Sequence, residues 1–254
     1  MALVACCLLG PGLRAQDGPG RMAEGIAAMK ALDPRGAADA FETILAGDSL
    51  QVEANWRAAL ALIDIGKQVR EADRNPTRDS LYRLAERYAR RGVTLAPDSA
   101  ATHFALALAL GRSALTKGKK ERIRSALEIR NEARRALDLN PDHDGAWHVL
   151  GRWHAEIERL SNLEEFFARK FLGGEVFGEA SFAEAVRCME RAVELRGDFI
   201  YHRLDLAEVY VELKRWDDAR AQLRVVPGLP AQDVMDHVYR ARADVLLHKI
   251  RNKL

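Results

Sequence analysis

The fold of this chain is decided by the stretch from Asn140 to Phe199. It begins with Asn140-Pro141-Asp142 and continues with Ala146-Trp147-His148-Val149-Leu150-Gly151-Arg152-Trp153-His154. Further along it reads Phe182-Ala183-Glu184-Ala185-Val186. Trp-x-x-Leu-Gly followed by Phe-x-x-Ala places large and small side chains at intervals of three and four, which lets two helices pack closely against each other. The stretch therefore predicts a pair of antiparallel helices.

Similar helix pairs are predicted along the rest of the chain. A Gly-Asp or Pro-Asp step recurs after the second helix of a pair, at Gly47-Asp48, Pro97-Asp98, Pro141-Asp142 and Gly197-Asp198. Repeated helix–turn–helix units near 34 residues are typical of tetratricopeptide (TPR) repeats. We predict an all-α, right-handed TPR solenoid of about five helix pairs that forms a single domain over 20–251. The units are predicted at about 20–48, 52–98, 100–142, 144–198 and 200–230, with a capping helix at 232–251.

The composition of the chain excludes some functions. It has 254 residues, of which 48% are hydrophobic and 30% charged, and its formal net charge is +2. No long basic run occurs, which argues against a nucleic-acid partner. The most basic stretch, 117–122, is interpreted as a solvated loop and helix start.

The first residues predict export. An apolar run from Met1 to Leu9 is followed by a Gly/Pro break and by Ala15. This pattern is typical of a signal peptide over residues 1–15. We expect an exported, periplasmic or envelope-associated protein. Two alternatives stay open: Leu3-Val4-Ala5-Cys6 resembles a lipobox, which would put a lipid on Cys6, and a leader that is not a signal would leave the protein in the cytoplasm.

No catalytic, metal-binding or cofactor-binding motif is present, so we predict a protein that is not an enzyme. If the leader is removed, Cys188 is the one cysteine left, and we interpret it as a packed thiol. His148 and His154 are six residues apart, so on one helix they point in different directions and do not chelate one metal ion. His154 is interpreted as a packed core residue, and Asp142 and Asp144 as N-cap residues of a helix.

The stretch beginning at Asn140 resembles a known family. Leu150-Gly151-Arg152-Trp153, Leu160-Ser161-Asn162-Leu163-Glu164, Phe171-Leu172-Gly173 and Phe182-Ala183-Glu184-Ala185 are similar to the TPR domain of the regulator of microtubule dynamics proteins. The resemblance covers 140–226. It implies an all-helical TPR fold without known catalysis. Eukaryotic members of the family are linked to microtubules and organelle membranes, and lipid binding by such a domain has been proposed. An exported chain would not meet a microtubule.

A binding groove is predicted on the concave side of the solenoid. In a TPR stack this side is lined by the first helix of each pair, at its second, fifth, ninth and twelfth positions. Applied to the third, fourth and fifth units, this rule selects Phe104, Leu108, His148, Arg152, Tyr201, Leu204 and Glu208 as partner or ligand residues. We predict a largely apolar surface, with charge from Arg152 and Glu208, that suits an amphipathic helix or an acyl chain.

The fourth unit contains about twenty more residues than the usual repeat, and they are rich in phenylalanine. Phe166, Phe167, Phe171 and Phe177 are interpreted as a possible lid over the groove or a patch that touches a membrane. The alternative is that they pack over the first helices and seal the core.

The sequence thus favours a non-catalytic TPR binding module, most simply an exported protein–protein interaction scaffold. The alternative is a carrier of lipid or another small apolar ligand, in which the groove and the Phe-rich insertion hold the cargo. Both predict contact with a protein, peptide or lipid and none with nucleic acid, and both allow contact with a membrane without spanning it.

Overall fold

The computed structural model describes residues 18–69, 75–114, 117–160 and 177–253. Within these ranges the chain forms eleven α-helices and two short 3-10 helices, and no strand. The all-α prediction is therefore confirmed. The predicted signal peptide and Phe166, Phe167 and Phe171 lie outside the described residues.

The helices follow one another as antiparallel pairs. They are α1 (Gly18–Lys30) with α2 (Pro34–Gly47), α3 (Val52–Gln68) with α4 (Pro76–Leu95), α5 (Ala100–Ala114) with α6 (Lys119–Leu139), α7 (Asp144–Glu158) with α9 (Phe182–Leu195), and α10 (Ile200–Glu212) with α11 (Trp216–Val225). A last helix, α12 (Asp236–Ile250), packs on α10 and α11. The short helices are η1 (Phe177–Glu179) and η2 (Val226–Gly228).

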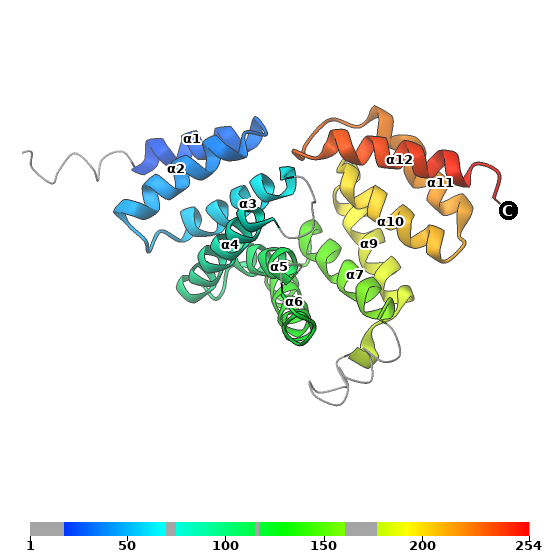
Figure 1. Cartoon of the computed structure of the whole chain (residues 1–254), viewed down its shortest axis with the longest axis horizontal. Helices are drawn as coiled ribbons and strands as arrows, with labels where there is room; N and C mark the ends of the chain where they lie inside the picture. The colour runs from blue at the N-terminus through cyan, green and yellow to red at the C-terminus, as the bar shows by residue number, and fades with distance from the viewer. Residues whose placement is uncertain (1–17, 70–74, 115–116, 161–176, 254) are drawn as a thin grey trace, which may run out of the picture.

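The pairs form a curved stack (Figure 1). Each helix packs on the next one along the chain, and the first helices of neighbouring pairs also touch, α3 on α5 and α5 on α7. The curvature brings the C-terminal end of α3 close to the start of α12 (Figure 1). No helix among the described residues is both long enough and apolar enough to cross a membrane.

Helix starts are fixed by local side-chain caps. Asp33 accepts a hydrogen bond from the Gly36 N–H, and Ser181 accepts one from the Glu184 N–H. These bonds satisfy backbone N–H groups that have no partner inside the helix. At α7 the cap is His143, whose Nδ1 accepts from the Ala146 N–H. The sequence-based assignment of the cap to the neighbouring aspartates was wrong, because the imidazole between them occupies the N-cap position.

Close helix packing depends on glycines that face large side chains. A Cβ built on Gly66 would clash with the Tyr82 ring, and one built on Gly151 would lie 2.7 Å from Met189 Cγ. The Gly151 Cβ would also lie 3.1 Å from the backbone oxygen of Ala185, so α7 and α9 approach each other through a position where only a hydrogen fits. The predicted role of the Leu-Gly step in helix packing is confirmed.

The two tryptophans of α7 differ in burial. Trp153 is 4% exposed, and its Nε1 donates a hydrogen bond to the Ala126 carbonyl at 2.7 Å. Trp147 packs against the neighbouring core but is only half-buried, and its Nε1 donates to the Pro141 carbonyl. Trp153 is therefore the deeper anchor of this helix.

Candidate functional site

Charged and aromatic side chains from five helices and one connecting segment gather on one side of the stack. Ion pairs, ring contacts and electrostatic interactions link these residues to one another. We refer to them as the inner face: Asp64, Lys67, Arg112, Arg152, Tyr201, Asp205, Glu208, Asp233, Tyr239 and Arg242. They come from α3, α5, α7, α10, the segment before α12, and α12 itself.

Lys67 joins the N-terminal part of the stack to its C-terminal cap. Its ammonium group lies 2.7 Å from Asp64 on the same helix and 2.8 Å from Asp233, which precedes α12. The Lys67 and Asp233 side chains are only 10% and 8% exposed. Burial would lower the pKa of Lys67, but the charges of the two carboxylates outweigh it and hold that pKa above its ordinary value. Lys67 is thus a charged, buried link between distant segments.

Aromatic and guanidinium groups continue the inner face across α7, α10 and α12. The rings of Tyr201 and Tyr239 are stacked, with centroids 4.6 Å apart and an interplanar angle of 18°. Arg152 donates a hydrogen bond to the Tyr201 hydroxyl, and its guanidinium lies 3.3 Å from Asp205. Burial would raise the pKa of Asp205, but Arg152 and His148 together hold it well below the usual range. Asp205 is therefore a carboxylate inside the protein.

Two histidines form a chain with two aspartates where α7 meets α10. His202 Nε2 lies 2.9 Å from Asp144 Oδ2, and His202 Nδ1 lies 2.7 Å from His148 Nδ1. His148 Nε2 then lies 3.0 Å from Asp205 Oδ2. The three contacts join a ring nitrogen to a carboxylate, the two rings to each other, and a ring nitrogen to a second carboxylate. Each contact needs one N–H hydrogen from a ring, so three ring protons are needed in all. Two neutral rings supply only two protons, so one contact pairs two acceptors unless the histidine pair holds an extra proton.

Burial and the neighbouring imidazole control how His202 titrates. Both rings are buried, with exposures of 5% for His148 and 3% for His202. Burial first, and then the charge of His148, lower the pKa of His202 from 6.5 to about 4. Asp144 opposes this shift by accepting the His202 hydrogen bond. His202 is therefore neutral near pH 7.

The predicted groove residues are divided between the inner face and the core. Arg152, Tyr201 and Glu208 belong to the inner face, and His148 contacts it through Asp205. Leu204 is fully buried in the C-terminal core. Phe104 and Leu108 are partly buried against the core, with the Phe104 ring 4.5 Å from His143. Phe177 begins η1.

The inner face carries more charge than the predicted groove residues indicated. The sequence rule sampled four positions per helix and missed the charged residues between or beyond them, namely Asp64, Lys67, Arg112, Asp205, Asp233 and Arg242. Asp64 and Lys67 could have been noticed, because they interrupt the apolar C-terminal half of α3 at a spacing of three. Asp233 could not, because nothing in the sequence indicates that the segment before the last helix reaches α3.

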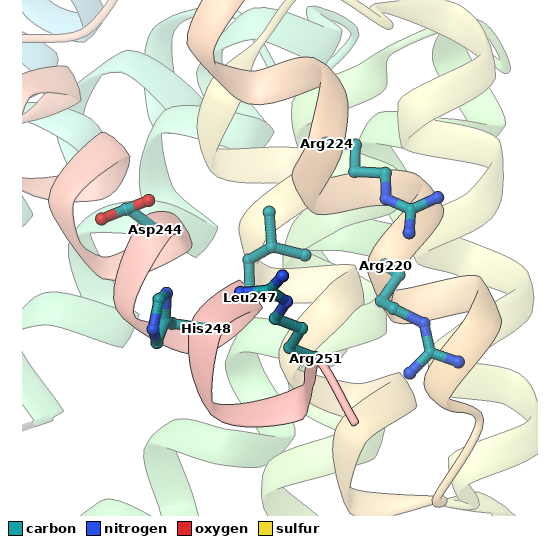
Figure 2. A pocket seen from close by; sticks show the side chains of 6 residues that line it. All are labelled: Arg220, Arg224, Asp244, Leu247, His248 and Arg251. Atoms are coloured by element: carbon teal, nitrogen blue, oxygen red, sulfur yellow. The ribbon is translucent and has the colours of Figure 1, made fainter. Parts of the chain in front are cut away.

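A hollow of about 250 Å³ lies between α11 and α12 (Figure 2). It is lined by Arg220, Arg224, Asp244, Leu247, His248 and Arg251. Arg220 donates hydrogen bonds to the carbonyls of Ile250 and Lys253 at 3.0 and 2.9 Å, and it pairs with Asp217 at 2.6 Å. Its guanidinium thus holds the end of α12 onto α11, which gives the hollow a structural explanation.

Ligand atoms suited to a metal ion come together away from the inner face. Among the described residues, a single group of at least three His, Cys, Asp or Glu side chains has suitable spacing: His154, Glu184 and Cys188, between α7 and α9. His154 and Cys188 are 3% and 0% exposed, in agreement with their interpretation as packed residues.

The repeat pattern and the fold agree with a known family. The family model described as "Regulator of microtubule dynamics protein 1-3" matches residues 28–251. The chain belongs to this family. The match extends well beyond 140–226, where the sequence motifs lie: it begins near the end of α1 and includes the whole of α12.

Individual members of the regulator of microtubule dynamics family are distant in sequence. Regulator of microtubule dynamics protein 3 of Rattus norvegicus is 27% identical over 69% of this chain and 36% of its own length. Regulator of microtubule dynamics protein 1 of Mus musculus is 24% identical over 76% of this chain and 62% of its own length. The chain therefore spans 36% of the length of one of these curated relatives and 62% of the length of the other.

Solved structures with a similar fold include a TPR protein. A thermophilic TPR protein of Thermus thermophilus superposes with a TM-score of 0.64 over 90% of this chain and 99% of its own, at 18% identity. PilF of Pseudomonas aeruginosa superposes with a TM-score of 0.54 over 93% of both chains, at 12% identity. At this identity the likeness shows the fold alone. Fold and family together indicate a protein-interaction module.

Proposed function

We propose that this member of the family is a non-catalytic scaffold that binds a segment of a partner protein along the inner face. The charged inner face is the observation that carries the proposal. Ion pairs hold the side chains of Arg152, Glu208 and Arg242 in position, yet these side chains remain 39%, 31% and 50% exposed. Partly exposed, oriented charges of both signs select a complementary polar partner and help to fix its register.

The same charges weigh against an acyl chain as the cargo. Apolar ligands are held in concave sites with predominantly hydrophobic lining. Here the stacked Tyr201 and Tyr239 rings provide apolar surface, but Lys67 and Asp205 lie close to them. A lipid on this surface would desolvate the partly exposed charges of Arg152, Glu208 and Arg242 without offering them polar partners. The lipid-carrier alternative would therefore depend on the Phe-rich insertion rather than on the inner face.

Site-specific photocrosslinking in cells of the native host tests the proposal. A photoreactive amino acid is placed at Glu208 on the inner face, and in a matched control at Arg87, an exposed residue of α4. We expect a discrete protein adduct from Glu208 that is lost when Arg152→Ala is added, and none from Arg87. Equal adducts from both positions would refute the inner face as the binding surface. Native mass spectrometry of the purified protein that shows a bound lipid, together with no protein adduct, would favour the carrier.

We further propose that the protein acts after export, in the periplasm or attached to the envelope. The support is the sequence of residues 1–15, with its apolar run and small residue before Gln16. Mass spectrometry of the mature protein from the native host checks this. A chain that begins at Gln16 supports export, one that begins at a lipidated Cys6 supports a lipoprotein, and an intact Met1 contradicts both.

A further inference from the structure

We propose that His154, Glu184 and Cys188 bind a divalent metal ion of the zinc class between α7 and α9. The three residues offer one ligand atom each, and these atoms all lie within 4.8 Å of one another. Glu184 and Cys188 are four residues apart on α9, so they point to the same face of that helix. His154 projects from α7, which packs closely against α9.

An unpartnered nitrogen distinguishes this group from ordinary core packing. His154 Nδ1 is buried and has no hydrogen-bond partner among the described residues, although the residue is only 3% exposed. A buried polar atom without a partner costs about 1–3 kcal/mol, so such atoms are rare and call for an explanation. A metal ion bound at Nδ1 supplies the missing partner.

The donor set suits zinc better than magnesium or calcium. A thiol, an imidazole and a carboxylate are the ligand types found around Zn²⁺, whereas Mg²⁺ and Ca²⁺ prefer oxygen alone. Burial is the main cause that lowers the pKa of His154, and this keeps the imidazole neutral and able to coordinate a metal ion. Burial raises the pKa of Cys188 to about 11, so the free thiol is protonated. Metal binding therefore releases one proton from Cys188 to solvent as the metal–sulfur bond forms.

The charges around the group are compatible with a bound cation. A thiolate and a carboxylate neutralise the two positive charges of the metal, so the bound unit carries no net charge. Arg187 donates to Glu184 Oε2 at 2.6 Å, which leaves the other carboxylate oxygen for the metal. Arg130 and Arg134 both pair with Glu179, whose carboxylate offsets one of their two positive charges.

The geometry requires only a small adjustment. Bond lengths of about 2.0–2.3 Å in a tetrahedral zinc site place the ligand atoms roughly 3.3–3.8 Å apart. Ligand atoms that lie within 4.8 Å of one another reach this arrangement by closing at most about 1–1.5 Å, to which rotation of the part-buried Glu184 side chain contributes. Three protein ligands leave the fourth position to water, so the bound ion would be exchangeable.

Cobalt titration of the full chain tests the site. The protein is stripped with a chelator and titrated with Co²⁺ while the near-ultraviolet thiolate-to-cobalt absorption is followed. Zn²⁺ is then added to displace the cobalt. We expect one ion per chain, loss of the band in Cys188→Ser, and binding at least about tenfold weaker in His154→Gln and Glu184→Gln. Zn²⁺ should raise the melting temperature of the unaltered protein but not of these variants.

Matched controls separate this site from other thiols and histidines. The double variant Cys6→Ser/Cys7→Ser and the surface variant His248→Gln should bind cobalt like the unaltered protein. Circular dichroism of each metal-free variant checks that it folds. If His154→Gln fails to fold, Glu184→Gln still decides the question, because its side chain is 41% exposed. Absence of the thiolate band, or a band that survives Cys188→Ser or disappears in Cys6→Ser/Cys7→Ser, would overturn the proposal.

Discussion

Substitution of Lys67 by methionine tests how much the contact between α3 and the segment before α12 stabilises the stack. The Lys67 ammonium contacts two carboxylates, at 2.7 Å and 2.8 Å, and the Lys67 and Asp233 side chains are 10% and 8% exposed. Lys67→Met keeps most of the apolar stem and removes the charge, so Asp64 and Asp233 lose their common partner. Breaking a buried ion pair by removing one member costs about 3–5 kcal/mol, because the remaining charge stays buried.

An exposed ion pair of the same chain provides the matched control. Arg21 pairs with Glu24 at 2.8 Å, but their side chains are 46% and 60% exposed. Arg21→Met should cost less than about 1 kcal/mol, because water screens the pair and replaces its contacts. The difference between the two substitutions therefore reports burial rather than the loss of a positive charge as such.

Urea denaturation at pH 7, followed by far-ultraviolet circular dichroism, measures both effects. Lys67→Met should lower the midpoint strongly. It should also broaden the transition, because a repeat stack whose ends are released can unfold in parts. Asp233→Asn should restore part of the lost stability when it is combined with Lys67→Met, since the double variant no longer leaves that carboxylate unpaired. If Lys67→Met costs no more than Arg21→Met, or the double variant is simply additive, the inferred stabilising link from Lys67 to Asp233 is wrong.

Three further predictions concern packing, pH and the thiol. Gly151→Ala should destabilise the protein by about 1–3 kcal/mol, because the added Cβ meets Met189 and the α9 backbone. A Cβ added at Gly111 meets nothing within 4 Å, so Gly111→Ala should be neutral or slightly stabilising. Urea midpoints of both variants check this prediction. The pKa of His202 is lowered from 6.5 to about 4, so the unfolded chain takes up a proton that the native protein does not, and stability should fall by up to about 3 kcal/mol as the pH drops from 6.5 to 4. A urea midpoint that does not change between pH 7 and pH 4.5 would contradict this. Cys188, whose pKa burial raises to about 11, should resist alkylation at pH 8 in the folded protein and react once it is unfolded; peptide mapping that shows rapid labelling of the folded protein would be inconsistent with its burial.

Much of the fold could be predicted because its signals are local. The Gly-Asp and Pro-Asp steps end helices through backbone geometry that adjacent residues control. The Leu150-Gly151 step indicates close packing because a helix places it directly against the partner helix of its own pair. Positions such as Trp147 and Trp153 are harder to rank, because both lie on α7 and their burial depends on which neighbouring pair each one faces.

The candidate sites depend on contacts that no short stretch of sequence contains. His154, Glu184 and Cys188 are brought together across a helix pair that a long insertion interrupts. His148 meets His202, 54 residues further along the chain, where two repeats pack side by side. In each case no single residue is unusual. Their chemistry arises because they are buried together, where the exclusion of water strengthens electrostatic interactions and hydrogen bonds.

The sequence by itself determined that the chain forms paired helices in a TPR stack, because spacing at three and four residues, small residues at crossings and helix stops all act within one repeat. Only the tertiary structure decided that the inner face is charged and that Lys67 reaches Asp233, 166 residues away. That contact depends on the curvature of the whole stack. Curvature is the sum of small rotations at every interface between helices, and no single repeat encodes it.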